Sequence, residues 1–79
     1  MNKITAILAA VSEEIAGIKQ AMNISDRIRL GKSEAWPGKW QGENIVLVRT
    51  GVGKQRAAEA ALKTIEQFSP YRLLSLGYA

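Results

Sequence analysis

The 79-residue chain contains no cysteine and no histidine. The first absence excludes disulfides and a thiolate site, and the two together exclude the usual zinc ligand sets. Carboxylates alone could hold a magnesium ion, but the sequence has no cluster of them. We therefore expect neither a metal nor another cofactor.

Clustered positive charge is also missing. Eleven Lys and Arg residues against seven acidic residues give a net charge of +4, but the basic residues are spread from Lys3 to Arg72 without a run. Such a spread is typical of a solvated surface, and the few aromatic residues do not form a platform for stacking bases. The sequence therefore predicts no nucleic-acid partner.

Long apolar runs are absent too. No stretch approaches the roughly 20 residues of a membrane-spanning helix. The opening MNKITAILAAVSEE is similar to a secretory signal, yet its apolar part is short and Glu13 and Glu14 follow at once. A buried strand that leads into a helix is the better interpretation, and it predicts a cytoplasmic protein with no membrane partner.

Hydrophobic patterning predicts an α/β fold. The nearly continuous apolar run Ile4–Val11 is typical of a strand covered on both faces, and a helix should follow from Ser12 to about Met22. Short strands are expected at about 26–31, 34–41 and 44–49. Pro37 in the middle strand indicates an edge, a bulge or an interruption there.

A second amphipathic helix and a last strand complete the pattern. The residues expected on the buried face of this helix are Ala58, Ala61, Leu62, Ile65 and Phe68. Ser69-Pro70 ends the helix, and 72–76 is predicted to be another buried strand. The expected fold is a mixed sheet of about five strands with two helices.

Between the third short strand and this helix lies Thr-Gly-Val-Gly-Lys, residues 50–54. Two glycines two apart permit a tight turn and a close backbone approach, and the helix start that follows could receive an anion or a sugar hydroxyl. The sequence is not a nucleotide-phosphate loop, because the first glycine of that motif is missing and Gln55 follows the lysine. A tight turn without a ligand is the alternative interpretation.

Glu13 and Glu14 open the first helix. Acidic side chains in a first turn stabilise the helix dipole by about 0.3–1 kcal/mol, which is sufficient explanation for Glu13. Because Glu14 follows a buried strand, its carboxylate could also lie at the carboxyl end of the sheet and act as a general base on water. Both interpretations of Glu14 remain open from the residues alone.

The final strand runs directly into Gly77-Tyr78-Ala79. The carboxyl ends of strands are where α/β proteins place binding loops, and an open sheet ending here would leave an unprotected edge. We expect residues 1–79 to be a single incomplete domain, the front part of a larger fold or a piece that needs a partner.

Three stretches taken together resemble a known family: AILAAVSEEIAGI, WQGENIVLVRTGVGKQRAAEAA and LLSLGYA. They are similar to the amino-terminal third of the purine nucleoside phosphorylase/nucleosidase superfamily. The nearest likenesses are the methylthioadenosine/adenosylhomocysteine nucleosidases and the hopanoid-associated phosphorylase-like proteins. This resemblance implies the front part of a three-layer α/β/α fold, a homo-oligomer, and cleavage of the N-glycosidic bond of a purine-type nucleoside.

The resemblance also implies roles for individual residues. Glu14 matches the glutamate that orients the attacking water. The substrate-binding positions that match are Ala10 and Val11 on the ribose side, Thr50, Gly51, Val52 and Gly53 in the turn near the sugar and its 5′ substituent, and Gly77, Tyr78 and Ala79 at the loop over the anion or water site.

Two departures from the family pattern bear on the reaction. Tyr78 stands where the nucleosidases usually have a serine, and AAVSEE does not resemble the glycine-rich anion loop of the phosphorylases. The second departure favours hydrolysis over phosphorolysis, with phosphate kept as a possible partner. The family's purine-binding residues and leaving-group acid come from a later part of the fold. The alternative function is a non-enzymatic α/β module that associates with itself.

Overall fold

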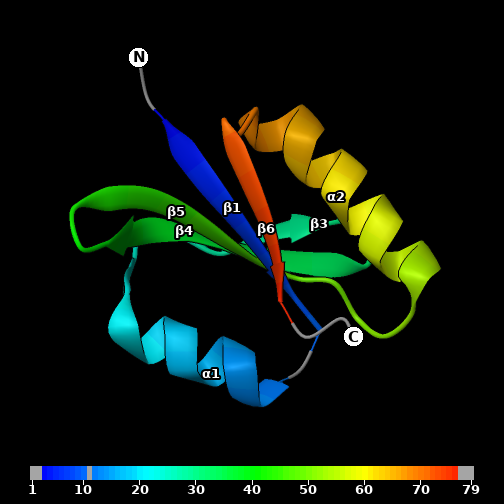
Figure 1. The fold of residues 1–79 in the computed structure, drawn as a ribbon, viewed down its shortest axis with the longest axis horizontal. Coiled ribbons are helices and arrows are strands. Elements are labelled where there is room, and N and C mark those ends of the chain that lie inside the picture. Colours follow the sequence, from blue (N-terminus) through cyan, green and yellow to red (C-terminus); the bar gives the residue numbers. More distant parts are fainter. Residues whose placement is uncertain (1–2, 11, 77–79) are drawn as a thin grey trace.

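The computed structural model describes residues 3–10 and 12–76. They form six strands and two helices (Figure 1). In chain order the elements are β1 (Ile4–Ala9), α1 (Ser12–Ala21), β2 (Asn23–Ile24), β3 (Ile28–Leu30), β4 (Ser33–Trp40), β5 (Glu43–Arg49), α2 (Lys54–Phe68) and β6 (Arg72–Leu76).

All the strands belong to one mixed sheet in the order β2-β4-β5-β1-β6, with β3 also paired to β4. The central strand β1 is parallel to β5 and to β6, whereas β4 is antiparallel to β5, β2 and β3. The predicted mixed α/β sheet with two helices is confirmed. The additional strand is the two-residue β2, which follows α1 directly where the sequence indicated only the end of a helix.

The two helices lie on opposite faces of the sheet, which gives three layers (Figure 1). Alternate residues of β5 enter two separate cores: Ile45 and Leu47 pack on the α1 side, and Val46 and Val48 pack on the α2 side. The same alternation holds along β1. Because both faces of β1 and β5 are covered, both strands are nearly continuous apolar runs.

Pro37 lies inside β4 without ending it. The two outer partners of β4 leave a gap at this residue, since β3 pairs with residues 33–35 and β2 with residues 38–39. The backbone N–H and the hydroxyl of Ser25 both donate to the Pro37 carbonyl, at 2.9 and 3.0 Å. The predicted interruption is therefore found in the neighbouring strands rather than in β4.

Helix α2 packs on the sheet through a different face from the one the sequence indicated. Ala60 and Thr64 are the buried residues, with the Thr64 hydroxyl donating to the Ala60 carbonyl at 2.7 Å. Leu62 and Ile65 are 64% and 50% exposed, and Ala58 is exposed as well. Of the predicted buried residues, only Ala61 and Phe68 pack against the α2-side core.

The reason is that α2 carries two stripes at helical spacing. The stripe on the sheet is made mainly of small side chains at positions 57, 60, 61, 64 and 68, and small side chains let a helix lie close to a strand. The second stripe, at positions 58, 62 and 65, faces away. Helical periodicity is the same for both stripes and could not separate them.

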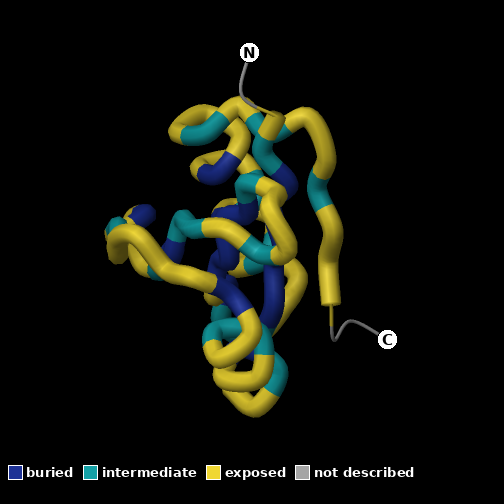
Figure 2. The backbone as a smooth tube through the Cα atoms, turned by 90° about the vertical axis from the view of Figure 1, so that its left-hand side faces the viewer, coloured by how far each residue is buried: buried dark blue, intermediate teal, exposed yellow. Residues whose placement is uncertain are grey.

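The predicted burial of β6 is also wrong for the described residues. Strand β6 lies at the edge of the sheet and pairs with β1 on one side only. It is exposed along most of its length (Figure 2), and Leu74 and Leu76 are 42% and 37% exposed. The strand therefore keeps one open edge and an apolar surface that residues 3–10 and 12–76 do not cover.

Two alanines in α2 test this orientation. Ala60→Leu is expected to destabilise the protein by about 1–3 kcal/mol, because the added carbons enter a filled core. Ala58→Leu, the matched control two residues earlier, is expected to change the free energy of unfolding by no more than about 0.5 kcal/mol. Urea denaturation measures both, and the opposite ranking would mean that the predicted face is the buried one.

Candidate functional site

The carboxyl ends of β1, β5 and β6 meet at one edge of the sheet. Ala9 is in register with Arg49 on one side and with Leu76 on the other. The backbone N–H of Thr50 donates to the Ala9 carbonyl at 3.0 Å, so the chain leaving β5 stays beside the chain leaving β1. Ala10 and Thr50, two of the predicted site residues, follow directly after the paired ends of these strands. The predicted site residues Val11, Gly77, Tyr78 and Ala79 lie outside the described residues.

Two glycines in the turn from β5 to α2 have positive φ angles, which permit a tight turn. Gly51 has a φ of 82° and Gly53 a φ of 106°, both in a region that side chains with a Cβ rarely adopt. Gly53 is the N-cap of α2 and provides no side-chain hydrogen bond to the helix start. The glycines therefore shape the turn and leave the amino end of α2 uncovered by a capping side chain.

Within this turn the side chains of Thr50 and Val52 differ in exposure. Thr50 is only 2% exposed, and its hydroxyl donates to the Gly51 carbonyl at 3.0 Å. Val52 is 87% exposed. A ligand at this edge would therefore meet the backbone of the turn and the apolar side chain of Val52, and the Thr50 hydroxyl is engaged within the protein.

Glu14 lies in the first turn of α1 and is half-buried. The next residue, Ile15, is 5% exposed and packs in the α1-side core, which holds the start of the helix against the sheet. The Oε1 atom of Glu14 is buried and receives no hydrogen bond from the part of the chain that the structure describes. Glu13, by contrast, is exposed.

An unpartnered buried carboxylate oxygen is unusual. Leaving such an atom unsatisfied costs about 1–3 kcal/mol or more, so folded proteins rarely keep one without a use. Water, a ligand or another segment of protein would remove this cost. The arrangement suits a carboxylate that holds a water molecule or a hydroxyl group.

Four exposed basic residues lie close together in the structure. Arg29, Lys32, Arg49 and Arg56 surround a single cleft together with Glu34 and Gly51, although in the sequence these cations are scattered. Arg29, Glu34 and Arg49 sit side by side on β3, β4 and β5. The signal that could have revealed part of this cluster was the register of the predicted strands, which places Arg29 and Arg49 on either side of Glu34.

The described residues contain neither a candidate metal site nor a candidate membrane-spanning helix. Among residues 3–10 and 12–76, no three His, Cys, Asp or Glu side chains gather as a metal site would require. Neither helix within those ranges is long and apolar enough to cross a membrane.

Comparison with known proteins decides the family. The family model described as the phosphorylase superfamily matches residues 4–79. The chain belongs to the phosphorylase superfamily. The predicted family is therefore confirmed.

Sequence relatives of this superfamily member include 5′-methylthioadenosine/S-adenosylhomocysteine nucleosidases. The nucleosidase of Aeromonas salmonicida is 33% identical over 73 residues, which are 92% of this chain and 32% of that protein. The nucleosidase of Oceanobacillus iheyensis is also 33% identical over 73 residues, with the same two coverages. The chain thus spans about a third of the length of the curated relatives it matches.

Solved structures agree with the sequence relatives. The nucleosidase of Neisseria meningitidis in complex with methylthio-immucillin-A is 28% identical and superposes with a TM-score of 0.89, over 95% of this chain and 32% of that one. A Helicobacter pylori nucleosidase variant with 5′-methylthioadenosine in its active site is 25% identical, with a TM-score of 0.86 and coverages of 100% and 35%. The fold described above is therefore the fold of part of these enzymes.

Glycine substitutions test the turn. Gly53 has φ 106° and ψ 153°, a region essentially restricted to glycine, so Gly53→Ala is expected to cost about 1–3 kcal/mol of stability. Gly17, in the exposed interior of α1, is the matched control: Gly17→Ala is expected to stabilise by about 0.5–1 kcal/mol. A Cβ at either position meets no atom within 4 Å, so the difference reports backbone conformation. Thermal unfolding of both variants gives the ranking, and a neutral Gly53→Ala would contradict the described turn.

Proposed function

We propose that the protein containing this chain cleaves the N-glycosidic bond of a purine-type nucleoside. The chain contributes the water-orienting carboxylate and the ribose-side backbone, and it is not expected to be active alone. The observation that carries the proposal is the buried Oε1 of Glu14, which has no hydrogen-bond partner among residues 3–10 and 12–76, in the helix that follows β1. Membership in the phosphorylase superfamily supports the same reaction class.

The chemistry follows from the charge that develops on the sugar. As the bond from C1′ to the base nitrogen breaks, its electrons leave with the base and positive charge builds on the ribose. A water molecule held by the Glu14 carboxylate would attack C1′ and give up a proton to Glu14. Positioned acid–base groups of this kind commonly contribute about 10²–10⁴ in rate.

The remaining predicted site residues follow, in the sequence, the three strands that end at this edge. Ala10 and Val11 follow β1, the turn Thr50–Gly53 follows β5, and Gly77–Ala79 follows β6. We assign Ala10, Val11 and the turn to the ribose and its 5′ substituent, and Gly77, Tyr78 and Ala79 to the loop over the attacking water. The exposed Val52 side chain suits an apolar 5′ substituent, and the relatives' names indicate 5′-thioadenosines as the substrates to examine first.

Hydrolysis is preferred over phosphorolysis within this proposal. The segment between β1 and the start of α1 lacks the glycine-rich anion loop of the phosphorylases, whereas Glu14 offers a ready base for water. Phosphorolysis of the same bond remains the second candidate reaction.

A different second candidate is a self-associating module without catalysis. It is favoured by the open edge of β6 and by the exposed Leu62 and Ile65 on α2. Unpaired strand edges and apolar patches promote association between chains. A homo-oligomer is compatible with both functions, because subunits of an enzyme could meet through the same surface.

Glu14→Gln in the complete protein is expected to lower kcat at least about 100-fold and to leave nucleoside binding detectable, since the amide keeps the shape but loses the base. Glu13→Gln is the matched control and should retain wild-type turnover. Release of free base measures kcat, and calorimetric titration with a substrate analogue measures binding. Wild-type turnover in Glu14→Gln, or equal loss in both variants, would reject the role of Glu14.

Sedimentation combined with a nucleoside thermal-shift screen separates the enzyme from the module. The enzyme is expected to gain thermal stability with an adenosine-like ligand, because a ligand that binds only the folded state stabilises it. A folded, monodisperse oligomer that is indifferent to every nucleoside tested would support the module.

A further inference from the structure

A cleft of about 250 Å³ opens beside the turn between β5 and α2. We call it the basic cleft, and its lining residues are Arg29, Lys32, Glu34, Arg49, Gly51 and Arg56. Four of the chain's eleven basic side chains meet in this one place, with a single carboxylate among them. They come from β3, the turn that follows it, β5 and the first turn of α2.

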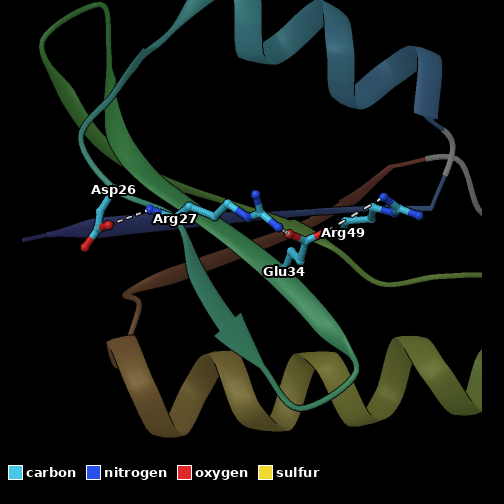
Figure 3. A network of polar contacts seen from close by, with 4 residues as sticks. All are labelled: Asp26, Arg27, Glu34 and Arg49. Carbon is cyan, nitrogen blue, oxygen red and sulfur yellow. Dashed lines mark hydrogen bonds and ion pairs between the residues drawn. The ribbon is translucent and has the colours of Figure 1, made fainter.

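The single carboxylate of the basic cleft, Glu34, offsets only part of the charge of these cations. Glu34 makes a 2.6 Å ion pair with Arg27, which is outside the cleft lining, and a much longer contact of 3.9 Å with Arg49. Figure 3 shows Arg27 and Arg49 approaching Glu34 from opposite sides. Over the described ranges, Arg29, Lys32 and Arg56 have no carboxylate within the 4.0 Å of an ion pair. The four cations of the cleft therefore exceed the negative charge that lines it.

The first turn of α2 adds to the positive charge at the basic cleft. It contains no acidic residue, and it carries Lys54 and Arg56 instead. The amino end of a helix favours negative charge, so two cations there oppose the stability of the helix. An anion bound at this point would interact favourably both with Arg56 and with the free N–H groups at the start of α2.

Gly51 allows Arg56 to take this position. The Arg56 Cδ atom lies 3.4 Å from the place where a Cβ on Gly51 would be. The arginine stem therefore lies over the glycine turn, and Arg56 belongs to the lining shared with Arg29 and Arg49.

We propose that the basic cleft is a binding site for a phosphate group, either free or carried on a larger molecule. Planar guanidinium groups bind phosphate oxygens in a bidentate way, and three arginines converge here. The proposal does not depend on the proposed catalytic function, because it uses neither Glu14 nor the reaction.

Two-dimensional NMR of the protein, titrated with sodium phosphate at constant ionic strength, tests this site. We expect saturable shifts of the backbone amides of residues 49–56. Arg56→Gln should weaken binding about tenfold or more. Lys39→Gln is the matched control, because it removes the same charge from the exposed opposite end of β4 and should leave the affinity within about twofold.

A nucleotide and the matching nucleoside identify the source of the phosphate. A parallel titration with adenosine 5′-phosphate, and with adenosine as its uncharged partner, shows whether the cleft prefers an attached phosphate. Binding of either phosphate that is lost in Arg56→Gln and kept in Lys39→Gln supports the site. Shifts that grow linearly without saturation, or equal weakening in both variants, would overturn it. Glu14→Gln should bind phosphate normally, so failure of the catalytic proposal is distinguishable from failure of this one.

Discussion

The parallel pairing of β1 between β5 and β6 is the constraint on which the rest of the structure depends. It buries β1 on both faces, divides the apolar residues of β1 and β5 between two cores, and requires helices on opposite sides of the sheet. The same pairing brings the carboxyl ends of three strands to one edge. The start of α1 and the turn before α2 meet there because each follows one of these strands.

The described residues leave two kinds of group unsatisfied, polar groups at the candidate sites and exposed apolar side chains. Glu14 Oε1 has no hydrogen-bond partner among the described residues, and the four cations of the basic cleft share a single carboxylate, Glu34. Such groups are satisfied by water, substrates or anions. Leu62, Ile65, Leu74 and Leu76 are apolar side chains that the described residues leave partly exposed, and exposed apolar patches mark surfaces that contact other protein. The second kind agrees with a chain that spans about a third of the length of its relatives.

Most of the fold could be predicted from local patterns. Continuous apolar runs indicated β1 and β5, and the turn residues between them indicated the hairpin strands. Two features were missed for physical reasons. The strand β2 is only two residues long and exists because it pairs with β4. The buried face predicted for α2 was wrong because Leu62 and Ile65 have the same helical period as Ala61 and Phe68. The stripe that packs on the sheet is the one with the smaller side chains.

For the candidate site, too, some features could be predicted from the sequence and others could not. The sequence by itself determined the family, the glycine turn and the position of Glu14 after a buried strand, because these depend on residues close together in the chain. Only the tertiary structure decided that Glu14 Oε1 is buried without a donor from the described part of the chain and that Thr50 is buried. It also decided that Arg29, Lys32, Arg49 and Arg56 share one cleft. Burial and charge clustering depend on strand register and helix placement, which bring together residues that are distant in sequence.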